Sequence, residues 1–385
     1  MARRETPAAG PGSRALVVDV IRSAVKISRV ELADVTGLTQ PSISNIVRDL
    51  IADGIIHEIG SVDSVRGKPR KLIAINPANR FGVGFHLGSE TLTCVAIDLT
   101  GGVVGREVVP LAGAAPPELL AERFDDFTAA LDLPRDRIEG LAVVAPDGHS
   151  ALSAPRAGLA GRIGLPVMVE NDAAAAALGE FWSRRVSREQ TFGSVYLSTG
   201  LGAGFVFGGA LVRGASFDAG ELGHLSIAYD GRPCPCGNTG CVERYASMAA
   251  TVEAARADPE LAGRLRLGSA LSGAYDAIAR AAVNGDPDAY RLIDAAAGHL
   301  SVAVTSMVNL LDLGRLVLTG PGVALAGSIY ARRLRAHLSR TAHARLRHDI
   351  AVELSAQPRD AASIGAAALV VQASIAPGHT PGLVG

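Results

Sequence analysis

The chain has little net charge and no long apolar run, and both absences limit what it can be. It carries 37 lysine and arginine side chains against 38 aspartate and glutamate side chains, a formal net charge of −1. It is therefore no polycation, and any binding of nucleic acid has to come from a local basic patch. No stretch of about 18 uninterrupted apolar residues is present, and the arginines of the N-terminal MARRETPAAGPGS have no apolar core behind them. We expect no membrane span and no signal peptide, and hence a cytoplasmic protein.

Cysteine is scarce, and its placement is uneven. The chain has four cysteines, and three of them lie in PCPCGNTGCVER at residues 233–244. In a reducing cytosol, clustered cysteines are more often metal ligands than disulfide partners. The fourth, Cys94, lies alone in the strand-like TLTCVAI and is interpreted as a small core residue.

Length and composition predict an ordered protein of several domains. Hydrophobic residues make up 48% of the chain and charged residues 19%, a profile typical of globular and not of disordered proteins. A chain of 385 residues exceeds the usual single-domain range, so two or three domains are expected.

Residues 13–77 have the pattern of three helices followed by a hairpin. SRALVVDVIRSA carries an apolar stripe at helical spacing. In SRVELADVTG, Ser28 and Glu31 have the spacing of a capping box, and Gly37 ends the helix. In TQPSISNIVRDLIADG, Thr39 is expected to cap the third helix, and a proline fits its first turn.

One face of the third helix and the loop after it suit contact with DNA. The strand-like IIHEIG and RKLIAIN flank the densest basic cluster of the chain, and we assign Arg66, Lys68 and Arg70 there to the DNA backbone or the adjacent minor groove. The exposed face of the helix carries short polar side chains that suit base edges and phosphates. These residues are Gln40, Ser42, Ser44, Asn45 and Arg48.

Together these features predict a winged helix-turn-helix domain that binds double-stranded DNA. A dimer of such domains would read an inverted repeat. The alternative is a capping subdomain whose polar residues form a solvated face.

Strand-like and helical segments alternate in the rest of the chain, which predicts an α/β body. FGVGFHLGSETLTCVAIDLTGGVV reads as two consecutive strands joined by a tight turn. The glycines of STGLGAG could bring backbone amides close to a phosphate, although a tight β turn would need the same glycines.

Three motifs of the body are DAGELGHLSI followed by CPCGNTGCVERYAS, VENDAAAAALGE and STGLGAG. Together they resemble the ROK family, which contains sugar-responsive transcriptional repressors, uncharacterised reading frames and sugar kinases. The resemblance covers about residues 14–372. It implies a homodimer or homotetramer with two actin-like, ribonuclease-H-like lobes, residues 80–175 completed by a C-terminal helix at 360–375, and residues 176–359. It also implies a ligand cleft between the lobes. Possible sugar contacts there are Asn171, Asp172, Glu221, His224 and Glu243.

The same signature predicts a structural zinc ion. His224, Cys234, Cys236 and Cys241 offer one nitrogen and three sulfurs, a set that fills a tetrahedral zinc site. No coordination position would remain for water, which disfavours a catalytic zinc. The alternative is a loop of reduced cysteines without metal.

The sequence departs from the kinase pattern at several points. His86 replaces the aspartate that ends the first strand in the kinases, and imidazole is a poor ligand for magnesium. Ala174 replaces the family's second asparagine, and APDGHSALSAPRAGLAGRI lacks the longer loop that covers the sugar in relatives. We therefore expect a repressor whose degenerate kinase-like body senses a sugar or sugar phosphate and has no catalytic residues. The alternatives are a ligand-independent repressor and an active ATP-dependent sugar kinase with a DNA-binding arm.

Overall fold

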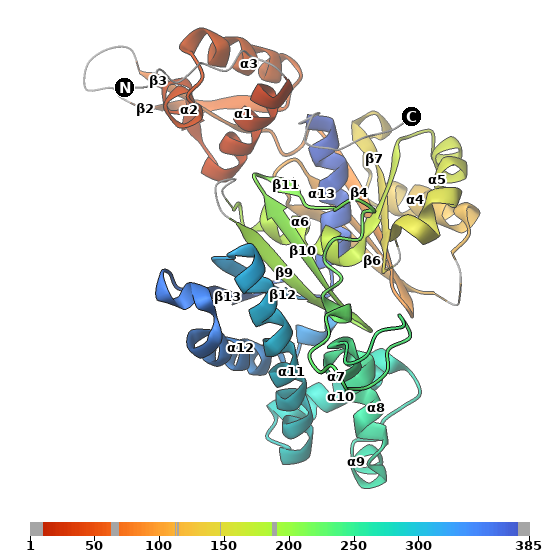
Figure 1. Ribbon diagram of the computed structural model, residues 1–385. Helices are drawn as coiled ribbons and strands as arrows, with labels where there is room; N and C mark the ends of the chain where they lie inside the picture. The colour runs from red at the N-terminus through yellow and green to blue at the C-terminus, as the bar shows by residue number, and fades with distance from the viewer. Residues whose placement is uncertain are drawn as a thin grey trace.

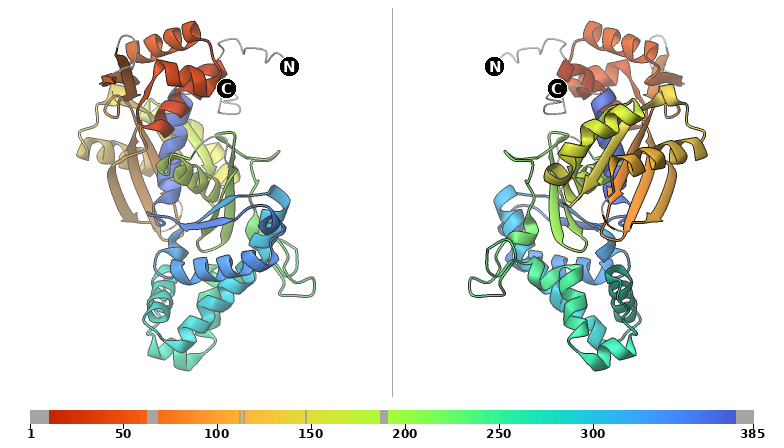
Figure 2. Two further views of the ribbon diagram at one scale, coloured as in Figure 1. Left: turned by 90° about the vertical axis from the view of Figure 1, so that its left-hand side faces the viewer. Right: turned by 90° about the vertical axis from the view of Figure 1, so that its right-hand side faces the viewer.

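The computed structural model describes residues 11–62, 69–111, 113, 115–146, 148–186 and 191–375, and it has an N-terminal module and a two-lobed body (Figure 1). The module lies at one end of the elongated molecule, and helices of the second lobe lie at the other (Figure 2). Within the described residues, no helix combines the length and the apolar character needed to cross a lipid bilayer.

The N-terminal module is a winged helix-turn-helix, as predicted. Its helices are α1 (Pro11–Ala24), α2 (Arg29–Thr36) and α3 (Gln40–Ala52). Its antiparallel sheet has the order β1–β3–β2, with strands β1 (Ile27–Ser28), β2 (Ile56–Val62) and β3 (Arg70–Ile75).

Local side-chain hydrogen bonds set the turn between α2 and α3. The Ser28 hydroxyl accepts a hydrogen bond from the amide of Glu31, while the Glu31 carboxylate accepts one from the amide of Ser28. Gly37 ends α2 in the left-handed region at φ 69°. The Thr39 hydroxyl accepts a hydrogen bond from the amide of Ser42 at the start of α3. The predicted capping box and cap are therefore both present.

Each lobe of the body is built on a five-stranded mixed sheet, and the two sheets have the same topology. The orders are β6–β5–β4–β7–β8 and β11–β10–β9–β12–β13, with three antiparallel strands followed by parallel pairs in each. The first sheet comprises β4 (Phe81–Leu87), β5 (Thr91–Asp98), β6 (Val103–Pro110), β7 (Ile138–Ala145) and β8 (Val167–Asn171). The second comprises β9 (Phe192–Leu197), β10 (Leu201–Phe207), β11 (Ala210–Leu211), β12 (Arg315–Thr319) and β13 (Ala351–Leu354). This duplication confirms the predicted actin-like architecture.

The remaining helices pack around these sheets. The first lobe has α4 (Pro117–Ala130), α5 (Gly148–Ile163) and the 3-10 turn Arg135–Arg137. The second lobe has α7 (Glu243–Ala246), α8 (Met248–Arg256), α9 (Pro259–Arg264), α10 (Leu271–Val283), α11 (Pro287–Leu311) and α12 (Gly327–Thr341). Its 3-10 turns are Leu222–His224, Pro321–Val323 and His343–Leu346.

Two helices, α6 (Asp172–Ser183) and α13 (Ala361–Ile375), cross between the lobes. Helix α13 packs on β4, β5 and β7 of the first sheet, and α6 packs on β9 and β10 of the second. Their backbones approach so closely that a Cβ on Gly365 would lie 1.7 Å from the carbonyl oxygen of Ala175. Only glycine fits at this crossing.

Our division of the body between residues 175 and 176 falls inside α6 and stays a prediction. Helix α13 packs on the first sheet, and the assignment of residues 360–375 to the first lobe likewise stays a prediction.

Candidate ligand cleft, metal site and DNA-binding face

A cleft of about 610 Å³ lies between the two lobes. Its lining includes the turns that join β4 to β5 and β9 to β10, together with the start of α6 and of α10. All five side chains that the sequence suggested as sugar contacts line this one cleft. They are Asn171, Asp172, Glu221, His224 and Glu243.

The first two of these residues form the N-terminus of α6. Asn171 is the helix cap, because its side-chain oxygen accepts a hydrogen bond from the amide of Ala174 at 3.0 Å. Its side-chain nitrogen donates to the carbonyl oxygen of Pro146 at 2.7 Å. Asp172 is therefore the first residue of the helix and not its cap. Asp172 is buried, and its Oδ2 lies 3.4 Å from Nε2 of His86.

Glu243 joins the metal-ligand loop to the glycine-rich turn. Its Oε2 accepts a hydrogen bond from the amide of Leu201 at 3.0 Å. A Cβ on Gly200 would come within 2.5 Å of the same oxygen, so glycine is needed here for the carboxylate to approach the backbone. A backbone amide of the glycine-rich segment thus binds the Glu243 carboxylate.

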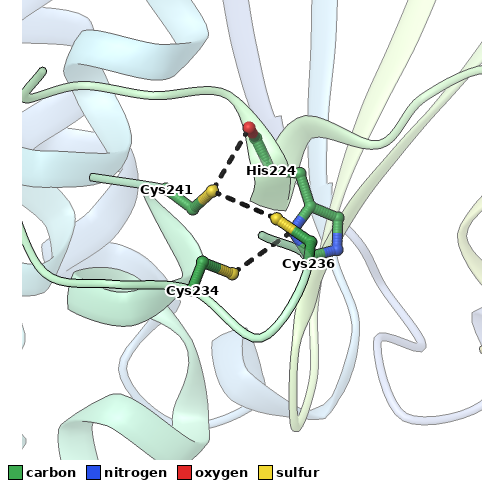
Figure 3. A group of neighbouring side chains, drawn as sticks. All are labelled: His224, Cys234, Cys236 and Cys241. Carbon is green, nitrogen blue, oxygen red and sulfur yellow. Dashed lines mark hydrogen bonds between the residues drawn. The ribbon is translucent and has the colours of Figure 1, made fainter. Parts of the chain in front are cut away.

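The four predicted metal ligands converge on one point (Figure 3). One candidate ligand atom from each of His224, Cys234, Cys236 and Cys241 lies within 4.8 Å of all the others. Cys234 Sγ is 3.6 Å from Nδ1 of His224, and Cys236 Sγ is 3.7 Å from Cys241 Sγ. Zinc–sulfur bonds of about 2.3 Å in a tetrahedron give sulfur–sulfur edges of about 3.8 Å, so the cluster has the size of a zinc site.

His224 belongs to both the metal cluster and the cleft. Its Nδ1 faces the cysteines, whereas its Nε2 lies 3.9 Å from Oε2 of Glu221. A carboxylate near the outer nitrogen is the usual way to orient a metal-bound histidine. A metal ion here would therefore also fix one wall of the cleft.

A second group of polar side chains, which we call the central cluster, comprises His86, Asp172, Tyr196 and Asp360. All four line the cleft, and the rings of His86 and Tyr196 meet edge-on with centroids 6.3 Å apart. Burial, with the charges of Asp172 and Asp360, raises the pKa of Tyr196 well above its ordinary value. Sequence analysis missed Tyr196 and Asp360, because nothing in FGSVYLSTG or PRDAAS marks either residue as polar cleft lining.

The two turns that would handle phosphate in a kinase touch each other here. The hydroxyls of Ser89 and Thr199 are 3.3 Å apart across the cleft. Glu90 accepts hydrogen bonds from the amide of Leu271, at 2.9 Å, and from the hydroxyl of Ser272. The hydrogen bond from Ser272 is the main reason that the pKa of Glu90 is lowered. A carboxylate thus occupies a turn that would have to accept an anionic phosphate.

The helix-turn-helix presents most of the predicted DNA contacts to solvent. Gln40, Ser44, Asn45 and Arg48 are exposed on α3, and Arg70 is exposed at the start of β3. Ser42 is half-buried and its hydroxyl bonds that of Thr39 at 2.9 Å, so it serves the helix cap as well. Arg66 and Lys68 lie outside the described residues.

The module is attached to the body through Arg22 of α1. The Arg22 side chain is 1% exposed, and its guanidinium donates to the carbonyl oxygen of Trp182 at 3.1 Å. The same guanidinium lies over the rings of Phe181 and Trp182, 5.3 and 4.8 Å from their centroids. Because both aromatic residues lie at the end of α6, the helix runs from the cleft to the N-terminal module.

Comparison with known proteins places this architecture among two-lobed sugar-kinase-like proteins. The family model for the ROK family matches residues 155–373, which is more than half of the chain. The protein therefore belongs to the ROK family, as its motifs predict.

Individual relatives fall in both branches of the family. The chain is 25% identical to the xylose repressor of Caldicellulosiruptor bescii over 93% of its own length and 95% of the repressor. The crystal structure of a ROK family transcriptional regulator, a homologue of the E. coli MLC protein, superposes with a TM-score of 0.73 at 26% identity, covering 95% of this chain and 96% of the regulator. A ROK glucokinase from Streptomyces griseus, in complex with glucose and AMPPNP, has a TM-score of 0.64 at 28% identity and covers 98% of itself but 75% of this chain.

The two structural matches differ in extent. The regulator covers about a fifth more of the chain than this glucokinase does, which is about the size of the N-terminal module. The matches to this regulator and to the C. bescii repressor take in more than nine tenths of the chain.

Proposed function

We propose that this protein is a sugar-responsive transcriptional repressor of the ROK family. The observation that carries the proposal is the winged helix-turn-helix docked by Arg22 on the far end of the helix that begins in the ligand cleft. Its full-length match to repressors and to a regulator structure supports it. A homodimer or homotetramer would present two modules to an inverted repeat in double-stranded DNA.

We assign base contacts to Gln40, Ser42, Ser44, Asn45 and Arg48. Arg66, Lys68 and Arg70 are assigned to the backbone or the adjacent minor groove. Short polar side chains on the exposed face of α3 suit base edges, and the basic wing after it suits phosphates.

The sugar site lies in the interlobe cleft. Carboxylates and two histidines line it, and such groups bind hydroxyls through hydrogen bonds. We assign hydroxyl contacts to Asn171, Asp172, Glu221, His224 and Glu243. A ligand that prefers one angle between the lobes would shift the position of α6 and hence of the module, by as much as its affinity differs between the two conformations.

The metal cluster is assigned to one structural zinc ion. Three sulfurs and one nitrogen fill its tetrahedral shell, so the ion would hold the loop from His224 to Cys241 without acting as a Lewis acid. The loop in turn positions Glu221 and Glu243 in the cleft.

The body is assigned no kinase activity. Asp172 could serve as a general base, but His86 offers imidazole where magnesium prefers oxygen, and Glu90 places a negative charge in the turn. Phosphoryl transfer depends mainly on positioning and on neutralising charge at the phosphate, and a base alone supplies only about 10² to 10⁴ in rate.

Binding of the operator tests the proposed function. DNA fragments selected from a genomic library by the full-length protein should share an inverted repeat, and a sugar should weaken their binding. Arg48→Ala should weaken binding to the selected site by about 1–3 kcal/mol and relax its specificity.

Arg291 provides a matched control, because the two side chains are similarly exposed, at 70% for Arg48 and 77% for Arg291. Arg291 lies on α11 in the second lobe, so Arg291→Ala should leave DNA binding unchanged. Equal effects of the two substitutions would contradict the assignment of α3 as the recognition helix.

A further inference from the structure

The central cluster contains polar atoms that the chain itself leaves without hydrogen bonds. Within the described residues, the buried Tyr196 hydroxyl, His86 Nε2 and Asp360 Oδ1 have no hydrogen-bond partner. Tyr196 is 1% exposed and lines the cleft. A buried polar group that is left unpaired destabilises the protein, because it has lost its hydrogen bonds to water. A molecule bound in the cleft can therefore supply these atoms with hydrogen bonds.

The types of atom in the central cluster define what that molecule can offer. A phenol hydroxyl both donates and accepts, and the carboxylates of Asp172 and Asp360 accept. A ligand hydroxyl can donate to a carboxylate and accept from the phenol at the same time. A phosphate ester offers mainly acceptor oxygens and carries about two negative charges at neutral pH, so it matches only the donors.

The negative charge of the cleft also disfavours a phosphate ester. Glu90, Asp172, Glu221, Glu243 and Asp360 line it, and the only guanidiniums among the lining residues are those of two arginines.

Both arginines are already engaged by carboxylates. Arg106 Nε lies 2.7 Å from Oδ2 of Asp360, and an amino group of Arg359 lies 2.7 and 2.9 Å from the two carboxylate oxygens of Asp276. Binding a phosphate would require breaking one of these ion pairs or placing the phosphate beside carboxylates in a partly buried site, where charges are poorly screened.

We propose that the central cluster binds an unphosphorylated hydroxyl of the sugar and excludes sugar phosphates, so that this regulator responds to free sugars. The proposal rests on the proposed function, because it assumes that the cleft holds the effector. It assigns ligand contacts to Tyr196 and Asp360 in addition to the residues that the family motifs suggest.

Titration calorimetry on the full-length protein, with its metal retained, tests this selectivity. The probes are D-xylose, D-glucose and N-acetyl-D-glucosamine, each paired with its monophosphate ester at the terminal hydroxyl. At least one free sugar should bind, and its phosphate should bind at least about tenfold more weakly, because a like charge a few ångströms away is costly at low dielectric. A phosphate that binds as tightly as its free sugar would overturn the proposal.

Two substitutions locate the selectivity in the central cluster. Tyr196→Phe keeps the ring and should weaken binding of the free sugar about three- to tenfold, the value of one neutral hydrogen bond. Tyr290→Phe is the matched control and should have no effect, because Tyr290 lies on α11 and is not among the residues that line the cleft. Asp360→Asn removes a carboxylate and frees Arg106 from its ion pair. It should therefore reduce the difference in affinity between the free sugar and its phosphate ester. The assignment of the central cluster as the hydroxyl site would be contradicted if Tyr196→Phe bound the free sugar as tightly as the wild type. It would also be contradicted if Asp360→Asn kept the same difference in affinity between sugar and phosphate ester.

The outcome also separates this proposal from the proposed function. A protein that binds its operator and is released by a sugar phosphate keeps the repressor function and overturns the selectivity. A protein that binds its operator but none of the three free sugars overturns the selectivity and favours the ligand-independent repressor.

Discussion

At the scale of single residues, the four candidate metal ligands carry the clearest chemistry. Their side chains come from a loop with little regular structure. A metal ion bound only by the native arrangement adds its binding free energy to the stability of the fold.

Cys236→Ser should therefore lower both the zinc content and the melting temperature. Elemental analysis of protein purified without added metal should find about one zinc per chain in the wild type and much less in the variant. Cys94→Ser is the control, because Cys94 is buried in β5 and burial raises its pKa to about 12. That substitution should cost stability without changing the zinc content. A wild type that is fully stable without metal would refute the site.

The pairing of His86 with Asp172 leads to a prediction about catalysis. An assay coupled to ADP release, with a panel of hexoses and amino sugars, should detect no turnover in the wild type. The reason is that imidazole cannot replace the carboxylate that handles the metal-bound phosphate. Turnover that disappears in Asp172→Asn would instead establish the kinase alternative.

At the scale of elements, the turn between β4 and β5 holds the lobes together. Glu90 reaches from this turn to the first residues of α10, where its carboxylate accepts from the amide of Leu271 and the hydroxyl of Ser272. A carboxylate near a helix N-terminus is favoured by the helix dipole as well as by the hydrogen bonds. The contact joins the two lobes beside the cleft.

Glu90→Gln should lower the free energy of unfolding by about 1 kcal/mol at neutral pH, the usual value of such a hydrogen bond. Because the pKa of Glu90 is lowered below 4.5 in the folded protein, its contribution is complete above that pH and is lost as the pH falls through the lower folded value. Denaturant unfolding at several pH values should show the difference between wild type and variant shrinking in this acidic range. Glu118→Gln, which breaks an exposed ion pair with Arg162, should change stability little at any pH. If the difference in unfolding free energy between wild type and Glu90→Gln did not depend on pH, the proposed role of the ionised Glu90 carboxylate would be contradicted.

At the scale of the whole molecule, α6 connects the interlobe cleft with the N-terminal module. It has 12 residues and is about 18 Å long, with its first residue in the cleft and its last turn under Arg22. The close crossing with α13 prevents it from bending independently of the body. A rigid helix held at both ends can carry a change in lobe angle to the module.

Arg22→Lys should reduce the effect of the sugar on operator affinity. The ammonium cannot stack on two rings as the planar guanidinium does, so the module would follow α6 less closely. Coupling between two sites commonly changes affinity about 5- to 150-fold. We expect the ratio of operator affinity without sugar to that with sugar to fall towards one in this variant, while sugar binding itself is retained. Arg29→Lys, whose parent side chain pairs with Glu58 inside the module, is the control and should keep the ratio. An unchanged ratio in Arg22→Lys would exclude this contact from the signal path.

The sequence by itself determined the elements whose causes are local. The capping box of Ser28 and Glu31, the cap at Thr39 and the spacing of the metal ligands involve residues close together in the chain, so their geometry follows from helix and turn chemistry. Alternating strand-like and helical segments predicted an α/β body, and its two lobes were implied by the resemblance to the ROK family that the glycine, carboxylate and cysteine motifs carry. The domain boundaries and the role of each site residue stay predictions.

The tertiary structure alone decided which distant residues meet. Tyr196 and Asp360 become cleft residues because a strand end of one lobe and a helix start of the other converge there. Arg22 meets Trp182 across 160 residues of chain. Such contacts depend on the packing of whole layers, where a side chain's partners are set by the angle between sheets and helices and not by its neighbours in sequence. Burial, and with it the raised pKa of Tyr196, follows from the same packing.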